Sequence, residues 1–442
     1  MTLANASADP KSGPDQPGAG STPEPTAPSL WRNGDFLKLW GAQSFGQLGA
    51  EVAVLAMPLT AVLLLHATPF QVGLVIAAEF LPFLIVGLPA GVWVDRRRRR
   101  NVMLLANFGR AGVLLLIPVA YLLGVLNIWL LCGVIFLTGI LTVFFDVAYQ
   151  SYLRTLVRPD QMVDGNAKLE FSNSAGELLG PSIGGFAIQL VGPVVAVLVN
   201  TGGYLASGLS LLAIRKREEA PAEDASADQG LVAEIRAGVR FVFGHQYLRA
   251  IAACTALTNL FGFGGAVQAI LVIYATGPLD MSAGALGLAL AIGNGAALVA
   301  AAAGNRLLVR LGLGRVMIGA IVLTTGGALF LPMATPSTAM VVVAVVAGLH
   351  GVGATVYNIC QISLRQCLTP PRMQGRMNAT MRFAVWGTIP IGALLGGTLA
   401  TFLGIRPTLW LVGVVSLLSW LPLALSPIRS LRRMPEPAVD VP

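Results

Sequence analysis

Seven charged side chains stand inside long apolar stretches of this sequence, where packing alone does not account for them. A charge near the centre of a bilayer costs about 3 kcal/mol or more, so each one needs a partner or a function. Acidic groups in this setting can carry protons or bind a substrate, and acid–base pairs can hold two parts of a protein together. The seven are Glu51, Glu79, Arg110, Asp146, Glu170, Glu177 and Arg382.

Glu51 is the leading candidate for a proton or substrate site. Gln43, Gln47 and Glu51 recur at helical spacing along one apolar stretch, so they share a polar face. An isolated carboxyl group there can bind and release a proton; the alternative is a structural hydrogen bond within the helix wall. Glu170 and Glu177 stand two helical turns apart on nearly one face of a later stretch and form a second candidate path.

Asp146 and Arg382 are better suited to a gate. Asp146 lies about six residues, roughly 9 Å, from the expected end of its helix, a depth that favours a gate over the alternative of a proton carrier. Glu170 and Arg382 occupy equivalent positions in two halves of the chain, and we expect them to pair if their helices meet. We expect Glu79 to pair with a neighbouring helix.

Membrane-spanning helices must position these groups. The chain has 442 residues, of which 55% are hydrophobic and 11% charged, and its mean hydropathy is +0.73. A helix needs roughly 20 apolar residues to cross a bilayer, which leaves room for about twelve spans, whereas a β-barrel would show short alternating segments. The expected spans are 36–65, 69–93, 101–124, 127–152, 165–190, 193–214, 247–275, 281–308, 314–335, 338–365, 374–403 and 406–427.

Basic residues mark one side of these spans. Lys and Arg cluster at the ends of alternate spans, from the run Arg96 to Arg100 to the run Arg429 to Arg433, and only Arg406 falls on the opposite side. The positive-inside rule therefore predicts that both termini and the central linker are cytoplasmic, which requires an even number of spans.

The two halves of the chain resemble each other at a constant displacement of 212 residues. Asn166 corresponds to Asn378, Gly180 to Gly392, and the pair Gly184 and Gly185 to Gly396 and Gly397. Repeated halves with a substrate site between them suit alternating access. The expected parts are a disordered cytoplasmic tail (1–35), a six-helix bundle (36–214), a cytoplasmic linker (215–246), a second six-helix bundle (247–428) and a cytoplasmic tail (429–442).

The loop after the second span carries a recognisable motif. Its sequence, Gly91-Val-Trp-Val-Asp95-Arg96-Arg97-Arg98-Arg99-Arg100, resembles the Gly-x-x-x-Asp-Arg-x-Gly-Arg-Arg motif of the major facilitator superfamily, with Arg98 in place of the second glycine. The resemblance implies a fold of twelve helices in two pseudo-symmetric bundles. It also implies that Gly91, Asp95, Arg96, Arg99 and Arg100 form a cytoplasmic gate in which Asp146 pairs with Arg99, with Arg110 as a second partner. Simple positive-inside topology is the alternative reading of the arginines.

The fifth span carries a second motif, made of Gly176, Gly180, Pro181, Gly184 and Gly185. It matches the Gly-x-x-x-Gly-Pro-x-x-Gly-Gly motif of drug:proton antiporters in this superfamily, while ordinary small-residue packing is the alternative. The stretches 144–152, 165–170 and 88–95 resemble a bacterial branch that contains enterobactin exporters and macrolide efflux proteins. The resemblance implies an inner-membrane efflux protein.

The expected function is proton-coupled efflux of a small amphipathic compound, such as a drug, siderophore or secondary metabolite. Uptake or transbilayer movement of a metabolite or lysolipid is the alternative that the same fold supports. The sequence contains no Walker loop, nucleophile elbow or paired metal-ligand spacing, so we expect no enzyme, no cofactor and no metal, with a proton gradient as the energy source. The expected partners are the bilayer, protons and the substrate; we expect a monomer and no nucleic-acid binding, because the basic residues form no single stripe.

Overall fold

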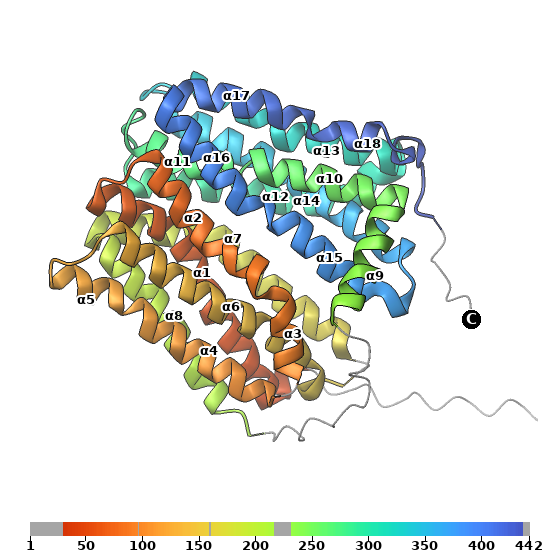
Figure 1. The fold of residues 1–442 in the computed structure, drawn as a ribbon, viewed down its shortest axis with the longest axis horizontal. Coiled ribbons are helices and arrows are strands. Elements are labelled where there is room, and N and C mark those ends of the chain that lie inside the picture. Colours follow the sequence, from red (N-terminus) through yellow and green to blue (C-terminus); the bar gives the residue numbers. More distant parts are fainter. Residues whose placement is uncertain (1–29, 96, 159–160, 216–230, 436–442) are drawn as a thin grey trace, which may run out of the picture.

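The computed structural model describes residues 30–95, 97–158, 161–215 and 231–435 (Figure 1). The expected tail 1–35 therefore lies largely outside the described residues, as do residues 216–230 of the expected linker 215–246. Throughout the described part the regular elements are helices, as predicted for an all-α membrane protein.

The first half of the chain forms one bundle, drawn in red to yellow-green in Figure 1. Asn33 accepts from two backbone amides at the start of the first helix, and Thr68 with Gln71 forms a capping box at the start of the second. The helices are α1 (Gly34–Leu65), α2 (Pro69–Ile85), α3 (Gly87–Asp95), α4 (Arg99–Leu114), α5 (Leu116–Leu122), α6 (Ile128–Leu156), α7 (Met162–Val191) and α8 (Pro193–Leu212).

The second half forms the other bundle, drawn in green to blue (Figure 1). Its helices are α9 (Leu231–Gly244), α10 (Gln246–Phe261), α11 (Ala266–Thr276), α12 (Ala283–Leu311), α13 (Leu313–Gly326), α14 (Ala339–Leu368), α15 (Gln374–Trp386), α16 (Thr388–Leu403), α17 (Ile405–Leu417) and α18 (Leu421–Ala424). The short helix α9 lies against α15, where Glu234 pairs with Arg376 at 3.3 Å.

The twelve expected spans all coincide with helical segments, but they are not equal. Within the described residues, ten helical segments are long and apolar enough to cross a membrane. The second expected span is a shorter apolar helix because the chain turns at Val86, between α2 and α3. The fifth, α7, is long but carries Asp164, Lys168, Glu170 and Glu177. The count of twelve spans stays a prediction for these two segments.

Helix direction divides the molecule into two ends. We call the end with Gly34, Leu212 and Arg433 the termini end, and the end with His66, Gly192 and Gly404 the far end. The repeat is also seen in the backbone conformation at the far end. Gly192 and Gly404 are 212 residues apart, and each links two consecutive helices with nearly the same φ value, +86° and +85°. Glycine adopts this conformation without strain.

The apolar core is shared between the halves at one end only. Toward the far end two clusters join the halves. One joins Val52, Leu55 and Leu59 of α1 to Val267 and Ile270 of α11, and the other includes residues of α2 together with Ala269 and Ala393. At the termini end each half has a cluster of its own, one around Phe36, Tyr152 and Leu211, the other around Ile251, Met317 and Leu423.

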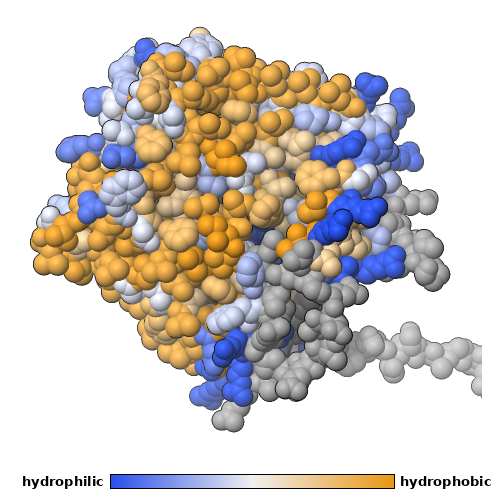
Figure 2. Space-filling view, viewed as in Figure 1, coloured by the Kyte–Doolittle hydropathy of each residue, from blue (hydrophilic) through white to orange (hydrophobic). Residues whose placement is uncertain are grey.

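The outer surface is apolar around the middle of the bundles. Figure 2 shows hydrophobic residues over most of the visible face, with hydrophilic residues gathered toward its edges. Large apolar side chains are also left exposed at the far-end helix termini, among them Leu122, Trp129, Leu190 and Phe402, each more than 70% exposed. Such a surface is typical of a protein whose solvent is lipid.

Candidate functional site

Glu51 lies on α1 where this helix packs against α7. Gln47 donates a hydrogen bond from Nε2 to Glu51 Oε1 at 2.8 Å, as expected from their i, i+4 spacing on one helix face. A Cβ added to Gly180 would lie 2.3 Å from Glu51 Cβ, and one added to Gly176 would lie 3.6 Å from Glu51 Cγ. Glycines of the α7 motif therefore let the backbone of α7 approach α1 at Glu51.

A cavity of about 210 Å³ lies beside Glu51. Its walls come from α1, α2, α4, α6 and α8 of the first half and from a single residue of the second half, Trp386 at the end of α15. Two carboxylate side chains line it, Glu51 and Glu79. The other lining residues are Ala50, Ala53, Val54, Met57, Phe80, Phe83, Leu114, Ile135, Thr138, Gly139, Thr142, Asn200 and Tyr204.

At the far end, α7 and α12 meet across the two halves. A Cβ on Gly287 would lie 2.2 Å from the carbonyl oxygen of Pro181 and 3.1 Å from Gly185 Cα. Gln189 adds polar contacts, since its Oε1 accepts from Ser282 Oγ and Gly284 N, both at 3.1 Å. We call the α7–α12 contact, together with the equivalent contact between α2 and α16, the far seam.

The counterpart joins α2 to α16. A Cβ on Gly73 would lie 2.4 Å from the carbonyl oxygen of Ala393, and one on Gly397 would lie 2.5 Å from that of Pro69. The amide of Phe70 donates to Thr401 Oγ1 at 3.2 Å. Because Gly397 is the repeat equivalent of Gly185, both halves use the same motif position to touch the other half.

Closer to the termini end, the halves meet through long side chains. Arg382 Nη2 lies 3.5 Å from Asp146 Oδ2, which joins α15 to α6. The same guanidinium lies 4.7 Å from the ring centroid of Trp386 and 5.5 Å from that of Phe83. We call this group of Asp146, Arg382, Phe83 and Trp386 the termini seam.

These contacts correct two predictions. Arg382 pairs with Asp146 and not with Glu170, which is exposed and forms no ion pair in the described part of the chain. Asp146 in turn pairs with Arg382 and not with Arg99 or Arg110. The physical reason is that α15 packs against α2 across the halves and reaches α6 through the Arg382 side chain, whereas α7, which carries Glu170, packs against α12.

Arg110 is buried in the first half, behind the cavity wall. Its guanidinium lies between the rings of Phe145 and Tyr204, at 4.4 and 4.1 Å from their centroids. It also donates to Asn107 Oδ1 and, at 3.4 Å, to Thr142 Oγ1. Two aromatic faces and two side-chain oxygens thus compensate this charge within its own half. Arg110 makes no ion pair with Asp146 among the described residues, and its role in the gate stays a prediction.

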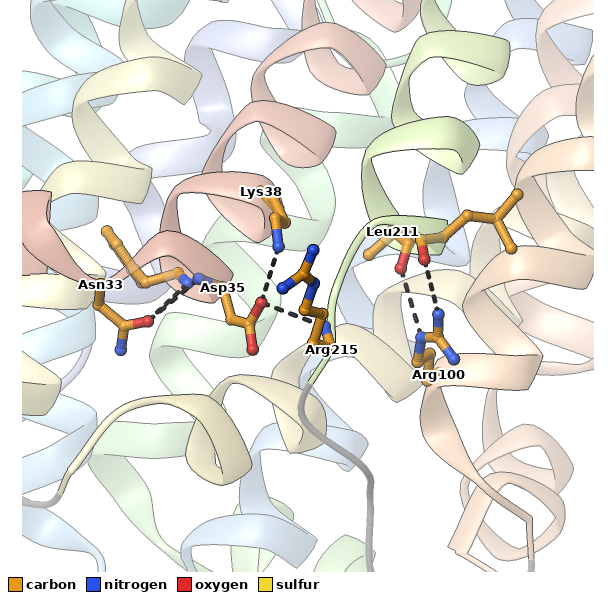
Figure 3. A network of polar contacts seen from close by, with 8 residues as sticks. Asn33, Asp35, Lys38, Arg100, Leu211 and Arg215 are labelled. Atoms are coloured by element: carbon orange, nitrogen blue, oxygen red, sulfur yellow. Dashed lines mark hydrogen bonds and ion pairs between the residues drawn. The ribbon is translucent and has the colours of Figure 1, made fainter.

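The loop motif is only partly described. Gly91 and Asp95 belong to α3, and the side chain of Asp95, like the whole of Arg96, lies outside the described residues. Arg99 begins α4. Arg100 donates to the carbonyl oxygens of Leu211 and Leu212 at 3.3 and 3.0 Å, where it caps the last turn of α8 in its own half (Figure 3). The gating role of the motif stays a prediction.

The remaining candidates lie around Glu51 but not within the cavity lining. Glu177 is exposed on α7, and its backbone carbonyl accepts from Asn294 Nδ2 of α12 at 2.8 Å. Gln43 Oε1 is buried and has no hydrogen-bond partner among the described residues. Their roles, and that of Glu170, stay predictions. Among the described residues, no group of three or more His, Cys, Asp or Glu side chains is arranged to hold a metal ion.

Sequence reasoning missed part of the cavity. The sequence predicts that the Glu79 side chain pairs with a group on a neighbouring helix. In the structure this residue lines the cavity and makes no ion pair within the described residues. Trp386 and Tyr204 are cavity residues that the sequence did not single out. A signal for Trp386 was present, because it follows Arg382 by four residues and so shares its helix face.

The chain matches known proteins over most of its length. The family profile described as Major Facilitator Superfamily matches residues 39–389 and 256–440. The multidrug efflux pump Tap of Mycolicibacterium fortuitum is 27% identical over 406 residues, which cover 87% of this chain and 95% of that protein. The uncharacterized MFS-type transporter YfiS of Bacillus subtilis is 25% identical over 390 residues, covering 85% of this chain and 89% of YfiS.

Solved structures share the fold at low sequence identity. A mutant of the nucleoside transporter NupG has a TM-score of 0.70 at 13% identity, covering 89% of this chain and 99% of NupG. A bacterial homologue of the iron transporter ferroportin, in an inward-facing state, has a TM-score of 0.70 at 17% identity, covering 90% of this chain and 99% of the other.

Proposed function

Since this chain belongs to the major facilitator superfamily, we propose that it is a secondary active exporter that moves a small amphipathic compound outward in exchange for protons. That it is a transporter of this superfamily follows from the match over most of its length. Members of the family and the relatives named above are transporters and not enzymes. Direction, coupling and substrate are the proposal.

The observation that carries the proposal is the unequal joining of the halves around one cavity. The far seam is made of close backbone contacts at Gly73, Gly185 and Gly287, whereas the termini seam depends on a few long side chains such as Arg382. A cavity between a tight seam and a loose one can open to one side while it stays closed to the other. Alternating access needs this arrangement.

Export is favoured over uptake by two observations. The α7 motif that resembles drug:proton antiporters is built into both the far seam and the Glu51 contact, through Gly185 and Gly180. The relatives include multidrug efflux pumps at 26% to 27% identity. Nothing comparable supports the alternative of uptake.

Proton coupling is assigned to Glu51. Its carboxylate lines the cavity, makes no ion pair in the described residues and holds one hydrogen bond, from Gln47. A carboxyl group in this position can exchange a proton for a substrate when the cavity opens to the other side of the membrane. The arginine distribution supports cytoplasmic termini in a bacterial inner membrane, and we propose that the protein acts as a monomer without a cofactor.

The proposal is tested in inverted vesicles energised with a proton gradient. A panel of charged and uncharged dyes, ethidium and Nile red among them, is followed for accumulation together with internal pH. We expect dye accumulation with proton release, both at least tenfold lower in Glu51→Gln and unchanged in Asp280→Asn, which removes an exposed loop carboxylate. Dye accumulation without proton movement, or in right-side-out vesicles only, would overturn it.

A further inference from the structure

The lining of the cavity beside Glu51 is biased toward negative charge. Two carboxylates, Glu51 and Glu79, face it from α1 and α2, and no Lys, Arg or His is among the lining residues that the structure describes. Two basic groups lie behind its wall and are already compensated there. Arg110 donates to Thr142 and lies over Tyr204. Arg382 lies against Phe83 and Trp386 and pairs with Asp146. A ligand within the cavity therefore meets negative charge first.

The polar groups of the cavity are poorly paired. In the described part of the chain neither Glu51 nor Glu79 forms an ion pair, and the hydrogen bond from Gln47 engages only one oxygen of Glu51. Asn200, from α8, is only 2% exposed, lines the same cavity and has an Oδ1 atom that accepts no hydrogen bond from the described residues. Buried oxygens left unpaired are costly, so this set is suited to a ligand that brings positive charge.

The cavity also has aromatic walls that already engage a cation. Phe80, Phe83 and Trp386 contact one another, with ring centroids 5.0 to 6.4 Å apart. The Arg382 guanidinium lies 4.7 Å from the Trp386 centroid and 5.5 Å from that of Phe83. Aromatic faces attract cations through the ring quadrupole, and the attraction strengthens when water is excluded.

The volume sets the size of the occupant. Pockets that bind drug-sized ligands usually have volumes of about 300–1,000 Å³. The cavity of about 210 Å³ is smaller and predominantly apolar apart from the carboxylates and a few amide and hydroxyl groups. In this state it fits a compact molecule with one aromatic ring and one charged centre.

From these observations we propose that the cavity binds a compact organic ammonium cation, with its charge at Glu51 and Glu79 and its apolar body against Phe80, Phe83 and Trp386. The inference deepens the proposed function, on which it rests, because it names the substrate class of the same cavity. Glu79 becomes a binding residue, and Trp386 is the contribution of the second half to the site.

Binding is measured by calorimetry on the full chain in nanodiscs, with empty nanodiscs subtracted. The probes are phenyltrimethylammonium, the uncharged dimethylaniline and the anion benzenesulfonate, which have similar sizes and one ring each. We expect the cation to bind at least tenfold more tightly than dimethylaniline, a difference of about 1.4 kcal/mol, and the anion not to bind. Equal affinities for the three probes would overturn the proposal.

Three variants locate the site. Glu51→Gln and Glu79→Gln are each expected to weaken cation binding at least tenfold while dimethylaniline binding stays within twofold, which also shows that the cavity is still formed. Trp386→Leu should weaken both ligands. The matched control is Asp280→Asn, which removes an exposed carboxylate from a loop at the far end. Cation affinity unchanged in both glutamate variants contradicts the assignment.

The outcomes separate this inference from the proposed function. Cation binding in a protein that moves no dye under a proton gradient would overturn the transport proposal and leave the binding site standing. Proton-linked export of Nile red without any binding of phenyltrimethylammonium would do the opposite, since the protein would then export compounds of another class.

Discussion

The far seam and the termini seam join the same two halves with different physical means. At the far seam, backbone touches backbone, because Gly73, Gly185, Gly287 and Gly397 carry no side chain to hold the helices apart. At the termini seam, the groups that meet are a carboxylate, a guanidinium and aromatic rings on long side chains. The apolar core follows the same division, shared at the far end and separate at the termini end.

The difference shows how one end can yield before the other. Close packing has little tolerance for displacement, since a small gap between two surfaces forfeits much of the dispersion energy. A partly exposed ion pair and a guanidinium over a ring are each worth about 1 kcal/mol or less, and water can replace them. The termini seam should therefore open more readily, and four substitutions test this difference.

The largest effect is expected at Gly287. Replacement by alanine would place a Cβ 2.2 Å from the Pro181 carbonyl oxygen, so the two halves must separate at the far end. We expect a loss of about 3 kcal/mol in the stability of the closed far seam and at least a tenfold fall in transport rate. Gly295→Ala on the same helix is the matched control, because its nearest neighbour would lie 3.7 Å away. Equal behaviour of the two variants in transport and cross-linking would refute the close-packed seam.

A smaller effect is expected within the first half. Gly180→Ala would bring a Cβ to 2.3 Å from Glu51 Cβ and push α7 away from α1. The expected loss of unfolding free energy is about 2 kcal/mol, read as a lower thermal midpoint in detergent. The control is Gly112→Ala on α4, where a Cβ would meet nothing within 4 Å. A Gly180→Ala protein as stable as the control would show that α1 and α7 are not in close contact.

At the termini seam, Asp146→Asn should act on the opening equilibrium more than on the fold. The Asp146–Arg382 pair is about one third exposed on both sides, so its loss is worth about 1 kcal/mol, a roughly fivefold rise in the separated population. Spin-label distances between the termini ends of α6 and α15 measure that population. The double variant Asp146→Arg with Arg382→Asp, which exchanges the two charges, should restore part of the closed population. If Asp146→Asn does not raise the separated population and the double variant does not lower it, the pair is not part of the gate.

The smallest effect is expected for the contact that fastens α9 to α15. Glu234 is 45% exposed where it pairs with Arg376, so Glu234→Gln should cost about 0.5 kcal/mol or less. Hydrogen exchange of the α9 amides should rise slightly, with transport unchanged. A large loss of transport in this variant would mean that the α9–α15 contact also controls opening, in addition to the far seam and the termini seam.

Much of the architecture was predictable because it depends on local properties of the chain. Apolar length located the helical segments, and Asn33 and Thr68 mark helix starts through their own side chains. The repeat predicted that Gly185 and Gly397 are equivalent, and both prove to touch the opposite half. The family resemblance was confirmed by the match over residues 39–389.

The pairing of charges was not predictable in the same way. Glu170 and Arg382 are equivalent by repeat, but equivalence in sequence does not bring two helices together. The 212-residue repeat makes α7 equivalent to α15 and α16. In the structure, however, α7 packs against α12 of the other half, and α15 packs against α2. For this reason Arg382 reaches Asp146, and Glu79, expected in a helix pair, lines the cavity instead.

By itself the sequence determined the membrane class, the helical segments, the repeat and the family, because hydropathy, capping and motif spacing are properties of neighbouring residues. Only the tertiary structure decided which end of the molecule is tight and which carboxylates share a cavity with Trp386. Those facts depend on how helices far apart in the chain approach one another, and the approach is set by the absence of side chains at a few glycines.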